Sequence, residues 1–352
     1  MSMVAMTALA LTGLGAFLIA AFAGKKMIPI LHKLKFGQTI RDIGPSWHKN
    51  KQGTPTMGGL IFMVAWALAI VAAAVICQLA FPDHDEVHLL SGGQGKSVMM
   101  TRLYTGVFLA IGCGIIGFVD DYIKVVKKRN LGLTERQKLL GQLLVATGYA
   151  IAVFWAEGGH PHMVVPFIGR IDMGWWFFPF CIFVIVAMVN ATNLTDGIDG
   201  LCSSVSVIAA LFFVTAAVLG MAAGQTYFGQ GVVAAALAGA LAGFLLYNLH
   251  PAKVFMGDTG SLFIGGVLCA LVFGMECPLL LVPVGLIYIA ETLSVILQVT
   301  YFKLTHGKRL FKMSPLHHHF EMSGWSENKV VGVFSFITLA GCIAAVLLLI
   351  YA

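Results

Sequence analysis

Ten apolar stretches alternate with polar ones along the chain. An α-helix needs about 20 apolar residues to cross the hydrocarbon core of a bilayer, and each stretch meets or approaches that length. The pattern therefore predicts an all-α polytopic membrane protein with about ten transmembrane helices. The stretches cover residues 3–24, 57–80, 99–119, 137–156, 174–190, 201–221, 230–248, 260–276, 278–300 and 330–351.

The boundary between the eighth and ninth stretches is marked mainly by Glu276 and Pro278. A count of eight or nine spans therefore stays open. The first stretch has no basic residue before it, and its charges follow it, which favours a retained helix over a cleaved signal peptide. No polar segment is long enough for a separate soluble domain, so residues 1–352 are predicted to form a single integral membrane domain.

Composition supports a membrane protein. Hydrophobic residues make up 59% of the 352 residues and charged residues only 11%, whereas a soluble domain has roughly 25% charged residues. The net charge of +6 does not indicate nucleic-acid binding, because the basic residues are spread over loops beside the spans. The seven cysteines form no CxxC pair and lie mostly within apolar stretches, which is typical of small buried hydrophobic residues.

The basic residues assign a side of the membrane to each loop. With ten spans, 19 of the 22 lysines and arginines fall in or beside one set of loops, and only Lys96, Arg102 and Arg170 fall on the other side. This excess predicts that the first set is cytoplasmic and that both termini are extracytoplasmic. Several aspartates and a run of histidines share the cytoplasmic side, which predicts one active-site cleft there. The cytoplasmic loops are residues 25–56, 120–136, 191–200, 249–259 and 301–329.

The segment Asn190–Gly200, NATNLTDGIDG, follows an apolar stretch directly. Asp196 and Asp199 are three positions apart and share a face if the backbone is helical, while Gly197 allows a bend or the close approach of a ligand. Because an aspartate at the centre of a bilayer costs roughly 2.5 to 3.5 kcal/mol, acids beside membrane spans indicate a functional site.

Two further segments carry carboxylates at the same membrane face. In GFVDDYIK, a divalent metal would resolve the repulsion between Asp120 and Asp121; the alternative is a solvated helix end where Asp120 pairs with Lys124. In PAKVFMGDTGS, Asp258 could face an anion or its metal, or act as an ordinary helix cap. Phe255 could stack on a base or anchor the chain at the membrane interface.

Two polar loops complete the candidate site. In KRLFKMSPLHHHFE, the histidines at 317–319 cannot all bind one ion from a regular helix, but from an irregular loop they could donate to a diphosphate; a basic surface loop is the alternative. In KQGTPTMGG, Lys51 and Thr56 could contact phosphate oxygens. Alternatively, Thr54 and Pro55 could form the cap and first residue of a helix.

One Mg²⁺ ion that handles phosphates would explain why these groups share a membrane face. Proteins bind Mg²⁺ through oxygen ligands, typically one or two carboxylates together with substrate phosphates. The scattered cysteines form no zinc site, because zinc sites need clustered ligands. The sequence therefore predicts magnesium-dependent phosphate chemistry.

Six motifs, spread over nearly the whole chain, strongly resemble those of the bacterial phospho-N-acetylmuramoyl-pentapeptide transferases. This family is a branch of the polyprenyl-phosphate N-acetylhexosamine-1-phosphate transferases. The wider superfamily shares the DD and NxxDGxDG patterns, whereas PTMGG and the HHH followed by Glu321 resemble the muramoyl-pentapeptide branch more closely. In chain order the motifs are KQGTPTMGG, GFVDDYIK, NATNLTDGIDG, VFMGDTGS, ETLSVILQ and SPLHHHFE.

The resemblance implies an enzyme of the bacterial cytoplasmic (inner) membrane, usually a homodimer. It implies transfer of phospho-MurNAc-pentapeptide from UDP-MurNAc-pentapeptide to undecaprenyl phosphate, which gives UMP and lipid I for peptidoglycan synthesis. It implies Mg²⁺ as cofactor, with Asp258 as the best-matched ligand beside Asp120, Asp121 and Asp196. It assigns the nucleoside pocket to Lys51, Gly197, Asp199, Asn248 and Phe255. It assigns other parts of the cleft to Lys124, Lys138, Asn190, Asn193, Gln298, His317, His318 and His319.

Alternatives in mechanism and function stay open on the sequence. Asp120 could act as general base on the lipid phosphate, with Asp121 positioning it, or an aspartate could form a covalent phospho-sugar intermediate. A related enzyme that transfers GlcNAc-1-phosphate would carry the same acidic motifs. An ion-coupled transporter would place ionisable groups within its spans, where Glu291 is the only strong candidate.

Overall fold

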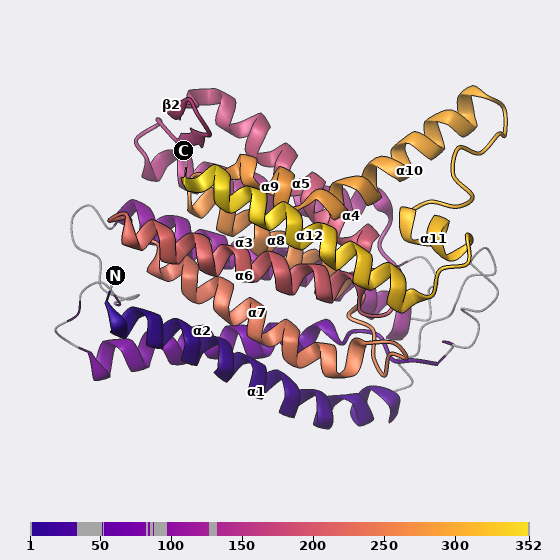
Figure 1. Ribbon diagram of the computed structural model, residues 1–352, viewed down its shortest axis with the longest axis horizontal. Helices are drawn as coiled ribbons and strands as arrows, with labels where there is room; N and C mark the ends of the chain where they lie inside the picture. The colour runs from indigo at the N-terminus through magenta and orange to yellow at the C-terminus, as the bar shows by residue number, and fades with distance from the viewer. Residues whose placement is uncertain are drawn as a thin grey trace.

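The chain folds as a helical bundle (Figure 1). The computed structural model describes residues 2–33, 51, 53–81, 84, 87, 97–126 and 132–350. Ten of the described helices are long and apolar enough to cross a membrane, which confirms the prediction from the apolar stretches. They are α1 (Met3–Lys33), α2 (Gly59–Ala80), α3 (Ser97–Val126), α4 (Glu135–Ala156), α5 (Phe177–Thr195), α6 (Leu201–Ala222), α7 (Phe228–Asn248), α8 (Gly257–Gly274), α10 (Leu286–Leu304) and α12 (Glu327–Ile350).

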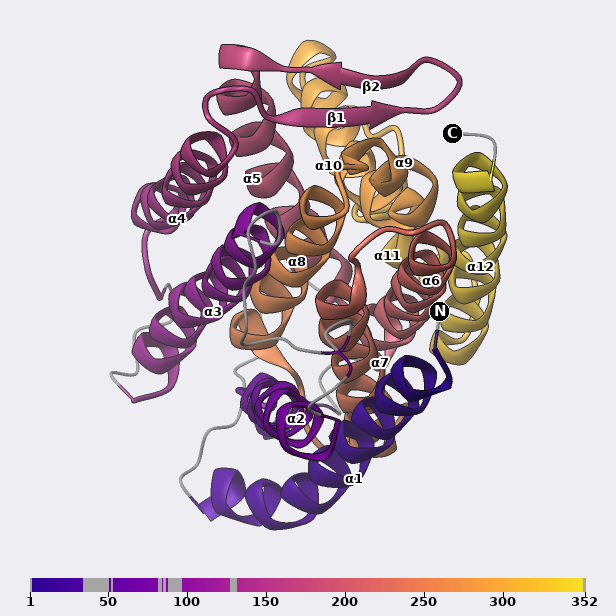
Figure 2. The ribbon, with the colours of Figure 1, turned by 90° about the vertical axis from the view of Figure 1, so that its left-hand side faces the viewer.

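Helices α7 and α8 form the interior of the bundle. In their membrane-length windows, 78% and 89% of residues are buried, whereas the windows of α1, α10 and α12 are each 28% buried. Helix α8 packs along α3 and also contacts α5 and α2, while α7 lies against α1, α6 and α2. Figure 2 shows the bundle end-on, with α1, α4 and α12 at its periphery. The interior helices are rich in glycine and alanine, because small residues allow helix backbones to approach closely within a membrane.

The ninth apolar stretch is not one continuous helix. The structure divides it into a short 3-10 helix, η4 (Pro278–Leu280), the single turn α9 (Leu281–Val284) and the spanning helix α10, which begins after Gly285. The prediction of one helix over 278–300 is therefore wrong in its boundaries. The prolines at 278 and 283 explain the break, because proline lacks the backbone N–H that a continuous helix needs.

A β-hairpin that the hydrophobic pattern did not predict lies across one end of the bundle. Strands β1 (His162–Val165) and β2 (Gly169–Asp172) pair antiparallel, with Val165 opposite Gly169, and are followed by the 3-10 helix η3 (Gly174–Trp176). Both chain termini lie at this end, whereas the short helix α11 (Leu316–Glu321) lies at the opposite end (Figure 1). Termini at the same end agree with an even number of spans.

Which end of the bundle faces the cytoplasm stays a prediction from the distribution of basic residues. Parts of the loops that carry them, residues 34–50, 88–96 and 127–131, lie outside the described residues. The α11 end contains every candidate site residue, as described below, and is the end predicted to be cytoplasmic.

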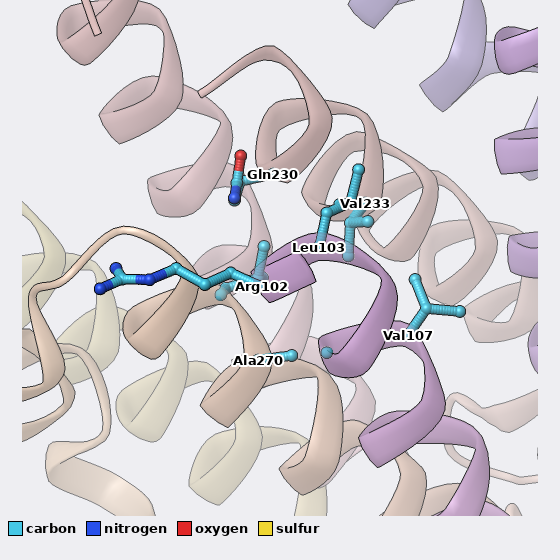
Figure 3. Close-up of a pocket in the computed structure, with 8 residues that line it drawn as sticks. Arg102, Leu103, Val107, Gln230, Val233 and Ala270 are labelled. Atoms are coloured by element: carbon cyan, nitrogen blue, oxygen red, sulfur yellow. The ribbon is translucent and has the colours of Figure 1, made fainter. Parts of the chain in front are cut away.

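Arg102 holds three segments together near the hairpin end. Its guanidinium donates to Glu157 Oε1 at 2.8 Å and to the Phe273 carbonyl at 3.1 Å, and lies 3.2 Å from Glu276 Oε1. The aliphatic part of the side chain lines a small pocket between α3, α7 and α8 (Figure 3). The Arg102 and Glu157 side chains are only 2% and 5% exposed, so the pair is shielded from water.

Replacing Arg102 by alanine is expected to destabilise the fold by about 3 to 5 kcal/mol, because it leaves a buried carboxylate without its counter-charge. Denaturant unfolding of the detergent-solubilised protein measures this. Arg170, which donates to Glu276 at 2.8 Å but is 56% exposed, provides the matched control. Its alanine variant should lose less than about 1 kcal/mol. Equal losses in the two variants would contradict a dominant role for the buried pair.

Candidate active site

Three carboxylates meet where α3 ends and α8 begins. Asp120 and Asp121 lie in the last turns of α3, and Asp258 is the second residue of α8. Ligand oxygens of these three residues all lie within 4.8 Å of one another. The structure thus brings together two motifs that are far apart in the sequence, as expected for a shared site.

The α8 backbone and side chains orient Asp121. Its carboxylate accepts hydrogen bonds from the Asp258 N–H at 3.2 Å, from the Thr259 N–H at 2.9 Å and from the Thr259 hydroxyl at 2.6 Å. The N-cap of α8 is Met256, so Asp258 is not an ordinary helix cap. Asp258 lies in the first turn of the helix, and its backbone N–H donates to Asp121. These hydrogen bonds fix the Asp121 side chain against the first turn of α8, where unpaired backbone N–H groups are available.

Two lysines converge on the third carboxylate. Lys124 Nζ and Lys138 Nζ each lie 2.8 Å from Asp258 Oδ2, and Asn193 Nδ2 donates to Asp258 Oδ1 at 2.7 Å. Lys124 also pairs with Asp120, so the ion pair expected at a solvated helix end is present but forms part of the larger cluster. Lys138, at the start of α4, joins the site as the resemblance implied.

The close contact between α3 and α8 depends on Gly117. A Cβ at this position would overlap the backbone carbonyl of Asp258, which cannot move without displacing the first turn of α8. The glycine of GFVDDYIK therefore sets the distance between the two acidic motifs.

Asp196 and Asp199 do not share a helix face, contrary to that expectation. Helix α5 ends at Thr195, and Asp196 is its C-cap, with φ −82° and ψ 51°, so the chain turns between the two aspartates. Burial, followed by the nearby carboxylates of Asp258, Asp121 and, least, Asp199, raises the pKa of Asp196 well above its usual value. Asp196 therefore borders the three-carboxylate cluster, while Asp199 belongs to a different group.

Asp199 lies in a second charged cluster with Lys51, His250 and Glu327. Lys51 Nζ lies 2.7 Å from both Asp199 Oδ1 and Glu327 Oε2. His250 Nδ1 lies 2.9 Å from Asp199 Oδ2, which also accepts the Ala252 N–H at 3.0 Å. The acidic and histidine side chains are spaced as metal ligands would be, but the Lys51 ammonium already provides the positive charge between the two carboxylates.

Two other residues assigned to the nucleoside pocket, Asn248 and Phe255, are held by contacts with neighbouring segments. Asn248 is buried, accepts the Ser203 hydroxyl at 2.7 Å and donates to the Val254 carbonyl at 3.0 Å. Phe255 is half-buried, and its backbone N–H bonds the Pro55 carbonyl at 2.9 Å, which ties it to the KQGTPTMGG loop. Helix α2 begins only at Gly59, so Thr54 and Pro55 are not its cap and first residue.

Thr56 lies on the carboxylate side of the site, whereas Asn190 links two helices. Thr56 is buried beside Gly257 and faces the carboxylate side, since a Cβ on Gly257 would approach both Thr56 Oγ1 and Asp121 Oδ2. Asn190 exchanges hydrogen bonds with the Gln142 side chain at 2.7 and 3.3 Å, and so links α5 to α4. Its amide also donates to the Val186 carbonyl at 2.8 Å, within α5.

The histidines lie in a helix, not in the irregular loop that the sequence suggested. His317 is buried in α11; its N–H donates to Glu291 Oε1 at 3.2 Å, and its ring Nδ1 lies 3.1 Å from the same oxygen. The His317 ring also packs directly on Gly197, where a Cβ would overlap Nε2. Since a helix spreads consecutive side chains around its axis, only His317 among the three faces the Asp196 turn.

The neighbouring histidines and Gln298 shape the loop around α11. His318 Nδ1 lies 2.7 Å from Glu321 Oε2, and His319 Nδ1 accepts the Lys312 N–H at 3.2 Å. Gln298 Oε1 accepts the backbone N–H groups of residues 310 and 311, at 3.1 and 2.8 Å. In this structure Gln298 therefore holds the loop that leads to the histidines.

Three polar residues of the site did not stand out in the sequence: Thr259, His250 and Glu327. Thr259 lies within the PAKVFMGDTGS motif and His250 directly precedes it, so their position was a usable signal. Glu327 stands alone before an apolar stretch, where an acidic residue is typical of any helix start. No local pattern could have indicated its contact with Lys51.

Comparison with known proteins identifies the family. The chain is 48% identical over 322 residues to the phospho-N-acetylmuramoyl-pentapeptide-transferase of Desulforamulus reducens, with 91% of this chain and 89% of that protein covered. The chain belongs to the phospho-N-acetylmuramoyl-pentapeptide-transferase family. Proteins of the same name from Acetivibrio thermocellus and Clostridium beijerinckii are 43% and 48% identical, each with 93% of this chain covered, and 91% and 92% of those proteins.

Two sequence profiles agree with membership of this transferase family. Residues 103–276 match glycosyl transferase family 4, a segment that includes Asp120, Asp121, Asp196 and Asp258. Residues 51–63 match phospho-N-acetylmuramoyl-pentapeptide-transferase signature 1, which begins at Lys51. Glu291, the ionisable residue that could have indicated a transporter, contacts His317 of the HHH motif.

The three-carboxylate cluster fits a magnesium ion. Asp120, Asp121 and Asp258 supply oxygen donors only, and their spacing lets one oxygen of each reach a common point. Oxygen-only sites with few carboxylates suit Mg²⁺, which completes its coordination with water and substrate phosphates. A bound ion would share the Asp258 carboxylate with the ammonium groups of Lys124 and Lys138.

Proposed function

We propose that the protein transfers phospho-MurNAc-pentapeptide from UDP-MurNAc-pentapeptide to undecaprenyl phosphate, giving lipid I and UMP. The observation that carries the proposal is a cluster of three carboxylates and two lysines at one end of a membrane bundle. The identity to relatives named for this transfer supports the choice of sugar and peptide. A site at the end of the spans suits a reaction between a water-soluble nucleotide and a lipid phosphate.

We further propose that the enzyme uses Mg²⁺ held by Asp258, Asp120 and Asp121, with Asp196 beside them. When bound, Mg²⁺ neutralises charge on the diphosphate and improves UMP as a leaving group. Lys124 and Lys138 are placed to pair with phosphate oxygens, since both ammonium groups already converge on one carboxylate oxygen. The barrier between two anionic substrates falls when these positive charges lie between them.

In the proposed direct mechanism, Asp120 takes the proton of the lipid phosphate if one is present. A phosphate oxygen then attacks the phosphorus next to the sugar, and the bond from that phosphorus to the bridging oxygen breaks to release UMP. Asp121, fixed by Thr259 and the Asp258 N–H, positions the first turn of α8 against α3. We assign to His317, which is buried between Glu291 and Gly197, a role in binding the diphosphate.

Release of UMP by the purified protein tests the proposed reaction. We expect release only when UDP-MurNAc-pentapeptide, undecaprenyl phosphate and Mg²⁺ are all present, with loss on chelation by EDTA. Efficient use of UDP-GlcNAc instead would replace the proposed sugar. UMP release without lipid phosphate, or a phosphorylated protein, would indicate the covalent route, and uptake into vesicles without UMP formation would indicate a transporter.

We also propose that the enzyme acts as a homodimer in the bacterial cytoplasmic membrane. This proposal rests on the resemblance of its motifs, together with the ten membrane-length helices. The mass of the protein in native nanodiscs, measured by light scattering, tests the dimer, and a monomeric mass at full activity would reject it.

A further inference from the structure

Two side-chain amides face each other between α4 and α5 and form a reciprocal pair of hydrogen bonds. Gln142 Nε2 donates to Asn190 Oδ1 at 3.3 Å, and Asn190 Nδ2 donates to Gln142 Oε1 at 2.7 Å. Gln142 is only 1% exposed, and a buried amide needs partners for both its N–H and its C=O groups. The pair therefore fixes the rotation and the height of α4 relative to α5.

The same faces of these helices carry two groups that contact Asp258. Lys138 lies one turn before Gln142, which places both side chains on one face of α4. Asn193 lies about one turn after Asn190, on one face of α5. Lys138 Nζ reaches Asp258 Oδ2 at 2.8 Å, and Asn193 Nδ2 reaches Asp258 Oδ1 at 2.7 Å. The amide pair thus lies about one helical turn from the place where both helices meet Asp258.

Helix α5 is fixed to α8 by hydrogen bonds of its own. The hydroxyl of Thr192, a fully buried residue, donates to the Ser261 carbonyl at 2.8 Å. Asn193 Nδ2 donates to Ser261 Oγ at 2.9 Å, in addition to its bond to Asp258. Helix α5 therefore keeps its position relative to Asp258 without help from α4.

Helix α4 depends more on its neighbour. It lies at the periphery of the bundle (Figure 2), and 33% of its membrane-length window is buried, compared with 89% for α8. Lipid tails are as apolar as leucine, so contact with lipid does not fix the height of a helix, whereas packing and interhelical hydrogen bonds do. Loss of the amide pair would allow α4 to shift and carry the Lys138 ammonium away from Asp258. The leucines exposed on the outer surface of α4 are Leu139, Leu140, Leu143 and Leu144.

We propose that Gln142 is a positioning residue for Lys138 in the phosphate transfer. Its paired hydrogen bonds with Asn190 set α4 against α5, so that the Lys138 ammonium is held beside Asp258. Gln142 acts through Lys138 and does not itself meet the reacting atoms. The inference rests on the proposed function, because it takes Lys138 to pair with a substrate phosphate.

The turnover of single and double variants, measured as UMP release at saturating substrates and Mg²⁺, tests the inference. Gln142→Leu removes both hydrogen bonds at similar volume. We expect it to lower kcat about tenfold, since a misplacement of 1 Å at a catalytic centre costs up to about a hundredfold. When Lys138→Met is already present, Gln142→Leu should lower kcat by less than about twofold, because the group that it positions is absent.

Gln230→Leu is the matched control. Gln230 is also buried in a span, but at the other end of α8, where its amide donates to the Gly274 carbonyl at 3.4 Å. This variant should keep its kcat, even if thermal unfolding shows that it is less stable. An equal loss of kcat in Gln230→Leu would assign the effect to any buried amide and would overturn the role of Gln142.

The same factor of loss for Gln142→Leu with and without Lys138→Met would also overturn the inference, because a general structural defect adds to the loss of the lysine. If Gln142→Leu does not fold, Gln142→Asn gives the same comparison, because it withdraws the amide from Asn190 by one methylene. Absence of UMP release by the wild type would reject the proposed function and this inference with it. Additive losses in an active enzyme would reject only the role of Gln142.

Discussion

Asp258→Asn is expected to lower UMP release about a thousandfold, equivalent to about 4 kcal/mol of transition-state stabilisation. The carboxylate of Asp258 receives Lys124, Lys138 and the amide of Asn193, and it is one of the three candidate metal ligands. An asparagine removes the negative charge that these groups share and weakens binding of a divalent cation. The steady-state rate at saturating substrates and several Mg²⁺ concentrations measures the effect.

A matched variant separates this loss from a general effect of removing an aspartate. Asp172 lies in the hairpin at the opposite end, where it bonds His160 at 2.7 Å and is 44% exposed. Asp172→Asn should keep nearly full activity. Substantial activity of Asp258→Asn that still depends on Mg²⁺ would remove Asp258 from the metal site.

Gly117→Ala is expected to lower activity at least a hundredfold, since a misplacement of about 1 Å at a catalytic centre costs about that much. The added methyl would overlap the Asp258 carbonyl, so α3 and α8 must separate at the point where their aspartates meet. Overpacking of this kind also costs roughly 1 to 3 kcal/mol of stability. Activity assays and thermal unfolding of the same preparation measure both effects.

Gly148→Ala is the matched control for the separation of α3 and α8. Gly148 also lies within a membrane helix, but a Cβ there would meet no atom within 4 Å. Its alanine variant should keep its activity and gain slightly in stability, because alanine favours helices over glycine. Similar losses in both variants would show that any added methyl in a span is harmful, and would contradict a specific role for Gly117.

Hydrophobicity was sufficient to predict the fold, because a segment within lipid must satisfy its own backbone hydrogen bonds as a helix. All ten apolar stretches contain a spanning helix, although the ninth breaks at Gly285. The hairpin at 162–172 was missed because its strands are four residues each and do not alternate clearly between apolar and polar positions.

The carboxylate cluster was predictable, because each of its aspartates lies in a short polar motif at the end of a span. The division between Asp196 and Asp199 was not, since it depends on where α5 ends. The contacts of His317 with Gly197 and Glu291 could not be predicted from the sequence either, because they result from the packing of α11 on α10. Contacts between elements far apart in the chain depend on packing geometry, which no local pattern records.

The charged cluster around Lys51 also has a consequence for biosynthesis. Lys51 precedes the second helix, whereas Glu327 begins the last one, and His317 comes shortly before it. During synthesis, the earlier helices enter the membrane before these residues have left the ribosome. The nascent chain therefore cannot form the ion pair between Lys51 and Glu327 until α12 has been made, so a chain truncated before α12 would lack this contact.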